Sequence, residues 1–138
     1  MKKVLLIIFC FLLLTGCINN DTKEDVKVSD IKVIINDKTY NLKLENNNTV
    51  EEFINLLPQE FTMNELNGNE KYVYLDKSLS TNSSSPKHIE KGDVMLFGDD
   101  CLVIFYKSFD TSYSYTKIGH IDNLEDLGEG NISAKFEK

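Results

Sequence analysis

Apolar and polar residues alternate one by one in several short runs between residues 31 and 137. In one of them, Tyr40, Leu42 and Leu44 alternate with polar neighbours. Successive side chains of a β-strand point to opposite faces, so this period of two is typical of strands buried on one side. The pattern predicts eight strands: Ile31–Ile35, Thr39–Leu44, Phe61–Leu66, Asn69–Leu75, Asp93–Phe97, Leu102–Tyr106, Tyr113–Ile121 and Asn131–Glu137.

Turn-forming residues separate these runs. Asn67-Gly68 lies between two of them, and this pair is a strong hairpin signal because both residues accept positive φ angles. Asn36-Asp37-Lys38 and Gly98-Asp99-Asp100 have similar turn chemistry. Asp76–Lys91 reads as a long polar loop in which Ser83-Ser84-Ser85-Pro86 has no anchor, and Asn123–Leu127 as one helical turn.

One segment has the pattern of a helix. Thr49 and Glu52 have the spacing of a capping box, and Pro58 marks the end. We expect the apolar face of this helix to close an open end or side of the sheet. That face consists of Val50, Phe53, Ile54 and Leu57.

Residues 31–138 are therefore expected to be a single all-β domain with one short helix. Eight strands with alternating faces can form a closed eight-stranded β-barrel filled by side chains, which leaves no exposed sheet edge. The first and last predicted strands are the natural pair to close it.

The N-terminus indicates where the protein works. Lys2 and Lys3 precede the uncharged run Val4–Leu14, which has the length of a signal-peptide core and is too short to span a bilayer. Leu14-Thr15-Gly16-Cys17 resembles the bacterial lipoprotein processing box. The resemblance implies cleavage before Cys17 and lipid on Cys17. An uncleaved anchor or a chance cysteine are the alternatives.

This interpretation divides the chain into three parts. Residues 1–16 are a lipoprotein signal peptide, residues 17–30 a polar, flexible tether and residues 31–138 the globular domain. Lipid on Cys17 would hold the protein at the extracytoplasmic face of a cell membrane, because several acyl chains bind a bilayer firmly. The membrane is then the partner of Cys17.

Cysteine and charge restrict the possible partners and chemistry. Once Cys10 is removed and Cys17 carries lipid, Cys101 has no partner for a disulfide, and its apolar surroundings in sequence predict a buried, inert thiol. Removal of Lys2 and Lys3 leaves 13 basic residues against 22 acidic ones, a net charge of −9. We therefore expect no nucleic-acid partner and no polybasic attraction to lipid headgroups.

Three stretches resemble a family of small bacterial cyclophilin-like domains: Leu66–Tyr74 (LNGNEKYVY), Gly92–Tyr106 (GDVMLFGDDCLVIFY) and Ser112–Ile121 (SYSYTKIGHI). The resemblance covers nearly all of residues 31–138 and implies a cyclophilin-like β-barrel. Most members of that family have no known function, and a shared fold does not determine function.

Cyclophilins isomerise prolyl bonds, and their catalysis uses an arginine whose guanidinium helps the proline nitrogen lose its conjugation. All 15 basic residues of this chain are lysine, and tryptophan, which helps to build the proline pocket of cyclophilins, is absent. A lysine is a point charge on a flexible stem and replaces the planar guanidinium poorly. We therefore expect no prolyl isomerase activity, although a weak or divergent isomerase stays an alternative.

A hydroxyl-rich run, Thr111–Thr116, precedes His120. If it were a strand, Tyr113 and Tyr115 would share one face with Thr111, and the other face would carry Ser112, Ser114, Thr116, Ile118 and His120. Cross-strand packing is one interpretation; the other is the wall of a site for an unknown small molecule or protein, because apolar walls with a few polar groups are typical of ligand pockets. The candidate ligand-binding residues are Tyr72, Tyr74, Phe105, Tyr113, Tyr115 and His120.

The sequence supports no catalytic assignment. Ser112 or Ser114 with His120 and Asp122 would form a hydrolase-like set, but His120 and Asp122 would lie about 6–7 Å apart along one strand, a loose orienting contact. An enzyme of unrecognised type with His120 as general base stays an alternative, as does a structural or interaction module with an exposed apolar patch.

No metal site and no cofactor are expected. His88 and His120 lie far apart in the sequence, and Asn64–Glu70 does not match a calcium loop. The chain has no glycine-rich phosphate loop.

Overall fold

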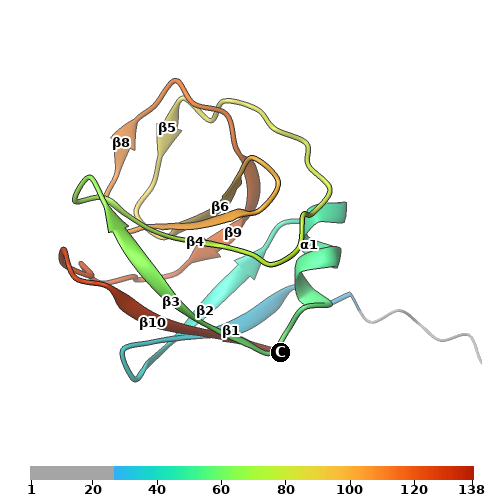
Figure 1. Ribbon diagram of the computed structural model, residues 1–138, viewed down its shortest axis with the longest axis horizontal. Helices are drawn as coiled ribbons and strands as arrows, with labels where there is room; N and C mark the ends of the chain where they lie inside the picture. The colour runs from blue at the N-terminus through green and yellow to red at the C-terminus, as the bar shows by residue number, and fades with distance from the viewer. Residues whose placement is uncertain (1–26) are drawn as a thin grey trace, which may run out of the picture.

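The structure, a computed structural model, describes residues 27–138 (Figure 1). The predicted signal peptide, most of the predicted tether and the lipidation residue Cys17 lie outside the described residues. The elements, in chain order, are β1 (Asp30–Ile35), β2 (Lys38–Leu44), α1 (Asn48–Ile54), β3 (Gln59–Leu66), β4 (Glu70–Tyr74), β5 (His88–Ile89), β6 (Asp93–Phe97), β7 (Cys101–Phe105), β8 (Phe109–Asp110), β9 (Thr116–Ile121) and β10 (Ile132–Glu137).

Eight of the strands in residues 27–138 form a closed antiparallel barrel in the order β1-β10-β3-β4-β7-β6-β9-β2. The first and last strands pair with Val33 opposite Phe136, which is the closure expected from the sequence. The prediction of an all-β fold with one short helix and a closed eight-stranded barrel is therefore confirmed.

The hairpin turns follow the turn chemistry of the sequence. Asn67 and Gly68 have φ angles of 55° and 67°, and Asn36 and Asp37 have φ angles of 48° and 68°. Two consecutive positive φ angles match the right-handed twist of the flanking strands. The β1–β2 hairpin has the register of a two-residue loop, with Ile35 opposite Lys38, whereas in the β3–β4 hairpin Leu66 lies opposite Glu70, so the loop includes Asn69 as a third residue.

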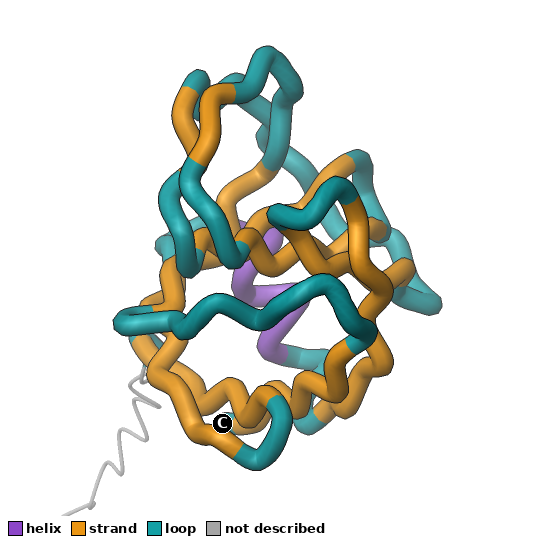
Figure 2. Tube along the Cα trace, turned by 90° about the vertical axis from the view of Figure 1, so that its left-hand side faces the viewer, coloured by secondary structure: helices purple, strands orange, loops and turns teal. Residues whose placement is uncertain are grey.

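The barrel interior is one apolar core. Inward-facing residues such as Val33, Leu42 and Phe136 are fully buried in it. The helix α1 contributes Val50 and Phe53, and the Phe53 ring meets the Phe136 ring edge-on with centroids 5.5 Å apart. Figure 2 looks into the barrel, with α1 at the far end. The helix closes that end, as its apolar face predicted.

The start of the helix differs from the sequence-based expectation. Asn47 is the N-cap: its Oδ1 accepts a hydrogen bond from the Val50 N–H at 2.8 Å, and its Nδ2 donates to the Lys117 carbonyl at 2.9 Å. Thr49 and Glu52 do not cap the helix, because both bind Ser80 in the following loop. The capping-box prediction was wrong for this reason.

A second apolar cluster lies outside the barrel. The alternate residues of β6 and β7 point outward and are buried too, so these two strands are covered on both faces. The outer cluster consists of Ile89, Met95, Cys101, Val103, Phe105 and Tyr115, with Tyr72 and Phe109 packed against it. Burial of Cys101 raises the pKa of its thiol to about 11, in agreement with an inert cysteine.

The cover over this cluster is a two-stranded arm, residues 84–91 with residues 108–115. Strands β5 and β8 pair in its middle, and Ser84 and Tyr115 exchange two backbone hydrogen bonds of 3.0 Å at one end. Figures 1 and 2 show the arm at the top of the molecule, beyond β4 and β6.

Three local predictions were wrong at the arm and beside it. The serine-rich stretch is anchored through Ser84, and the predicted strand Tyr113–Ile121 begins only at Thr116 because the preceding residues leave the sheet to build the arm. Residues 123–127 are not helical.

In the part of the chain that the structure describes, no helix has the length and apolar character needed to cross a membrane.

Candidate functional site

A cleft of about 540 Å³ opens between the arm, the outer face of β4 and the β6–β7 turn. Its size is within the range of small-molecule sites. We call it the tyrosine cleft. The side chains and backbone that line it belong to Leu66, Asn67, Asn69, Glu70, Tyr72, Tyr74, Phe97, Cys101, Phe109, Asp110, Thr111, Ser112, Tyr113 and Tyr115.

Four of the six candidate residues meet in this cleft. Tyr72 and Tyr74 come from β4, and Tyr113 and Tyr115 come from the arm. Phe105 lies directly behind the lining, fully buried, with its ring edge-on to Tyr115 at a centroid distance of 5.5 Å. The fold thus brings residues from two distant parts of the chain to one cavity.

The sixth candidate, His120, lies elsewhere. It does not line the tyrosine cleft, and its Nδ1 is 2.9 Å from Oδ1 of Asp93. Even on one continuous strand, His120 would face away from Tyr113 and Tyr115, because it lies an odd number of residues after both. The chain also leaves the sheet before Thr116, which separates the tyrosines from the histidine further.

The aromatic rings of the cleft pack on one another. Tyr72 and Tyr74 meet edge-on at 6.0 Å, Phe97 and Tyr113 at 6.2 Å, and Phe97 and Tyr115 are tilted at 5.6 Å. Edge-to-face contacts of this kind stabilise a pair by about 0.5–1.5 kcal/mol beyond the burial of its area. The walls are therefore preformed rather than loose.

The exposed apolar surface of the domain is concentrated at this place. In residues 27–138, the large hydrophobic side chains that remain exposed are Leu66 (42%), Tyr74 (66%), Phe97 (47%) and Tyr113 (64%). All four line the tyrosine cleft. Single exposed apolar residues are common, but a contiguous group around a cavity is typical of a binding site.

Two polar residues at the cleft were not among the sequence candidates. Glu70 shares the outward face of β4 with Tyr72 and Tyr74, two and four residues further on. Asn69 precedes it, and its Oδ1 is buried without a hydrogen-bond partner in the described residues. Glu70 has the period-two spacing of a strand with the two tyrosines, so a signal for it was present.

The charge of Glu70 influences the groups around it. Burial, and then the negative charge of Glu65, raise the pKa of the Glu70 carboxyl. The pKa of the Tyr115 hydroxyl is raised in turn by burial and by Glu70. The cleft therefore contains a partly desolvated carboxyl beside aromatic rings.

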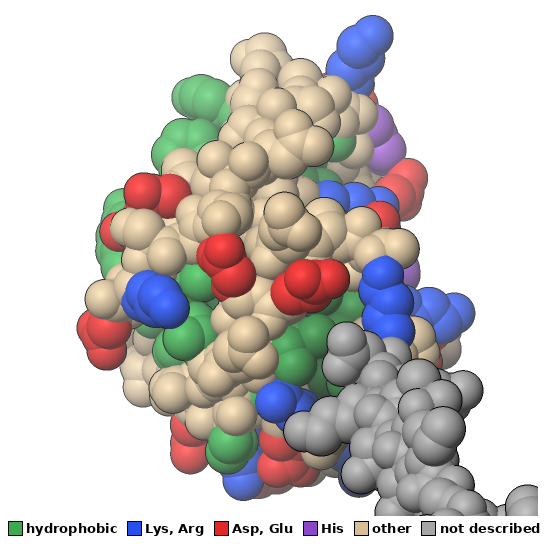
Figure 3. Space-filling view, turned by 90° about the vertical axis from the view of Figure 1, so that its right-hand side faces the viewer, with side chains coloured by type: hydrophobic (Ala, Val, Ile, Leu, Met, Phe, Trp, Pro, Cys, Tyr) green, Lys and Arg blue, Asp and Glu red, His purple; other side chains and the backbone are tan. Residues whose placement is uncertain are grey.

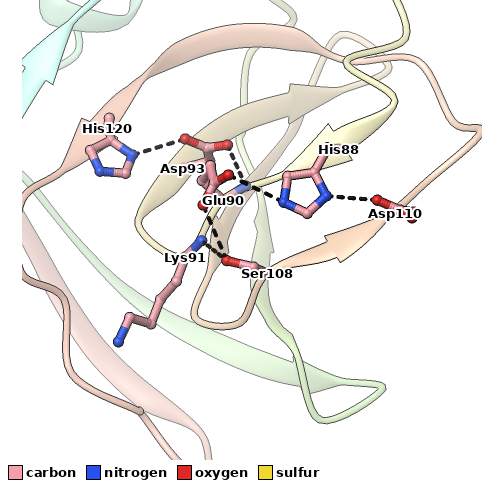
Figure 4. Close-up of polar contacts among 7 residues, drawn as sticks. All are labelled: His88, Glu90, Lys91, Asp93, Ser108, Asp110 and His120. Carbon is pink, nitrogen blue, oxygen red and sulfur yellow. Dashed lines mark hydrogen bonds and ion pairs between the residues drawn. The ribbon is translucent and has the colours of Figure 1, made fainter.

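A polar network holds the arm at its base (Figure 4). His88 on β5 contacts Asp110 on β8 at 2.6 Å and Glu90 at 3.2 Å. The Glu90 N–H donates to Asp93 Oδ2 at 2.9 Å, and Asp93 Oδ1 contacts His120. Hydrogen bonding to Asp110, together with the charges of Glu90 and Asp110, raises the pKa of the His88 imidazole against the opposing effect of desolvation.

The hydrolase-like set is not assembled. The carboxylate beside His120 is Asp93, whereas Asp122 pairs with Lys43 at 3.2 Å. Among the described residues, no serine hydroxyl is hydrogen-bonded to His120, and Ser112 lines the cleft on the arm. The arrangement thus offers an oriented histidine without a nucleophile.

Metal binding has no support in residues 27–138, where no group of three or more histidine, cysteine, aspartate or glutamate side chains could hold an ion.

Figure 3 shows the face that carries α1; on the part that is not covered by grey atoms, acidic and basic side chains are mixed. No continuous basic surface is visible there.

Comparison with known proteins agrees with this architecture. The model of the Cyclophilin-like family matches residues 33–137, which include the barrel strands except the first three residues of β1, together with α1 and the arm. Neither the curated proteins nor the solved structures contain a match to the chain. Because the family match extends over most of the sequence and the barrel closes as the family resemblance implied, the chain belongs to the cyclophilin-like family.

Proposed function

We propose that this protein is a lipid-anchored, extracytoplasmic binding protein whose cyclophilin-like domain takes a small ligand in the tyrosine cleft and has no prolyl isomerase activity. The observation that carries the proposal is the coincidence of the exposed apolar side chains Leu66, Tyr74, Phe97 and Tyr113 with one cavity. Leaving such side chains in water has no benefit for folding, so a ligand that covers them explains their placement.

A thermal-shift screen of the purified protein against metabolites and short peptides tests this binding role. A specific ligand raises the melting temperature by mass action. Tyr74→Ala and Tyr113→Ala should abolish the shift, whereas Lys32→Ala, an exposed change on β1, should preserve it. A hit whose shift survives both tyrosine changes would contradict a site in the cleft; a peptide hit would identify a protein partner.

The absence of isomerase activity is argued from the cleft and from composition. The chain contains no arginine, and none of the described residues that line the cleft has a basic side chain. No cation is therefore in place to assist a proline nitrogen there. A peptidyl-prolyl assay at high protein concentration should show no acceleration. Acceleration that persists after repurification would contradict the proposal.

The location of the protein is argued from the N-terminal sequence alone. A charged start, an apolar run and Leu14-Thr15-Gly16-Cys17 follow one another in the order of a lipoprotein signal peptide. Expression in bacteria with a labelled fatty acid should label the chain, and the chain should be found in the membrane fraction. The Cys17→Ser variant should carry no label and should be absent from the membrane fraction. A label that persists in this variant would contradict lipidation at Cys17.

The proposal includes no nucleic-acid partner and no cofactor. Without residues 1–16 the chain has a net charge of −9, which repels phosphate. A gel-shift experiment with single- and double-stranded DNA and RNA should show no complex at physiological salt. A retarded band there would contradict this part of the proposal.

A further inference from the structure

The charges that line the tyrosine cleft are all negative. Among the described residues that line it, Glu70 and Asp110 are acidic and none is basic. Asp110 is bound by His88 in the arm. Glu70 has no ion-pair partner in residues 27–138.

The alternation of β4 explains why Glu70 is left without a cation. The next residue, Lys71, points to the opposite face of the strand, where its Nζ lies 2.5 Å from Oε2 of Glu65. Tyr106 adds a hydrogen bond of 2.7 Å to the same carboxylate. Glu65 therefore accepts hydrogen bonds from two donors inside the barrel, Lys71 and Tyr106, and neither donor reaches Glu70.

A second acceptor at the cleft also lacks a donor. Oδ1 of Asn69 is buried and accepts no hydrogen bond within the described part of the chain. Buried polar atoms nearly always have a partner, because an unsatisfied one costs about 1–3 kcal/mol. The Glu70 carboxylate thus lines the cavity without a compensating cation, next to a buried amide oxygen that lacks a donor.

The walls of the cleft suit a cation with an apolar body. Tyr72, Tyr74 and Tyr113 contribute aromatic rings around the space beside Glu70. The face of an aromatic ring attracts a cation within about 6 Å, and an ammonium group donates hydrogen bonds to a carboxylate. An anionic ligand, in contrast, would meet Glu70 and no compensating positive charge.

We infer that the tyrosine cleft binds an organic ammonium compound, with its cationic nitrogen at the Glu70 carboxylate and its apolar body against the tyrosine rings. This inference rests on the proposed function, since it names the ligand class of the same cleft. Glu70 is then the residue that determines charge specificity, and the rings determine affinity for the body of the ligand.

Two probes of the same shape separate charge from shape: 2-phenylethylamine is a cation at neutral pH, and 2-phenylethanol is its uncharged counterpart. Titration of each into the purified protein, followed by NMR, should show the amine binding at least about tenfold more tightly, a difference of about 1.4 kcal/mol. Shifts should occur at residues that line the cleft, such as Tyr74 and Tyr113.

Glu70→Gln tests the assigned residue, because it removes the charge and retains the shape. The tenfold preference for the amine should disappear, while the affinity for the alcohol stays the same. Glu51→Gln, the same change on α1 away from the cleft, should leave the preference intact. The comparison of the two probes in the unsubstituted protein needs no variant, so the test holds even if Glu70→Gln folds poorly.

The outcomes separate this inference from the proposed function. Equal binding of both probes in the cleft, or a preference for the amine that survives Glu70→Gln, would overturn the inference and leave a ligand cleft in place. If no probe and no compound of the screen perturbs the cleft, the proposed function fails and the inference fails with it.

Discussion

Nζ of Lys71 lies 2.5 Å from Oε2 of Glu65, with the lysine side chain completely buried in the barrel. Lys71 also donates to the carbonyl oxygens of Gly128 and Gly130, and its ammonium lies 4.7 Å from the centre of the Tyr106 ring. The hydrogen bonds to Gly128 and Gly130 join the β3–β4 hairpin to the segment between β9 and β10. One buried ammonium group thus connects two parts of the chain at the edge of the core.

Lys71→Met should destabilise the domain by about 3–5 kcal/mol, because it leaves the Glu65 carboxylate partly buried without its cation. Urea unfolding followed by circular dichroism measures the loss. The double change Glu65→Met with Lys71→Met should cost less than Lys71→Met alone, since no unpaired charge remains. A double variant that loses the sum of both single costs would refute the ion pair as the cause.

Phe53→Ala should cost about 3–5 kcal/mol, since the ring is fully buried and packs edge-on against Phe136 at the end of the barrel. Glu51→Ala changes an exposed position of the same helix and should stay within about 0.5 kcal/mol of the parent. Unfolding curves of the two variants distinguish the closure of the barrel by the helix from a general effect on α1. Equal losses would contradict that closure.

Glu70→Gln should not lower the stability of the protein at neutral pH and should raise it. The pKa of Glu70 is raised in the folded state by burial and by the charge of Glu65. The protonated carboxyl therefore stabilises the folded state fully below the unfolded pKa of about 4.3, and this stabilisation is lost as the pH rises through the folded pKa. The gain of the Gln variant should therefore be present at pH 7 and absent at pH 3. Thermal melts at both pH values measure it, and a destabilised Gln variant at pH 7 would contradict the unpaired charge.

The arm should be held more firmly in mild acid than in alkali. The Asp110 hydrogen bond raises the pKa of His88, so the contacts of His88 with Asp110 and Glu90 are fully present below the unfolded pKa of about 6.5 and are lost as the pH rises through the folded pKa. Amide exchange at Ile89 and Phe109, compared with His88→Gln at each pH, measures the difference. Identical protection in both proteins below pH 6 would show that His88 does not hold the arm.

The barrel could be predicted from the sequence because its signals are local. The alternation in runs such as Tyr40 to Leu44 and the Asn67-Gly68 turn fix which face is buried and where the chain reverses. The start of the helix could not be predicted from the sequence. Thr49 and Glu52 have the right spacing for a cap, yet both bind Ser80, a contact that only the tertiary structure creates.

Part of the geometry of the candidate site could be predicted. Tyr72 and Tyr74 were chosen as aromatic rings with hydroxyl groups, and both lie on the outward face of β4. Strands β5 and β8 have only two residues each, too few for a periodic pattern, so the arm was not foreseen. Glu70 was overlooked although it continues the pattern of the two tyrosines.

The most direct test of the account is an NMR map of a ligand from the thermal-shift screen on the purified protein. The account predicts that shift changes are confined to the tyrosine cleft, with Tyr72, Tyr74, Phe97 and Tyr113 among the largest. Changes concentrated on another face of the barrel, with the signals of these four residues unmoved, would contradict it.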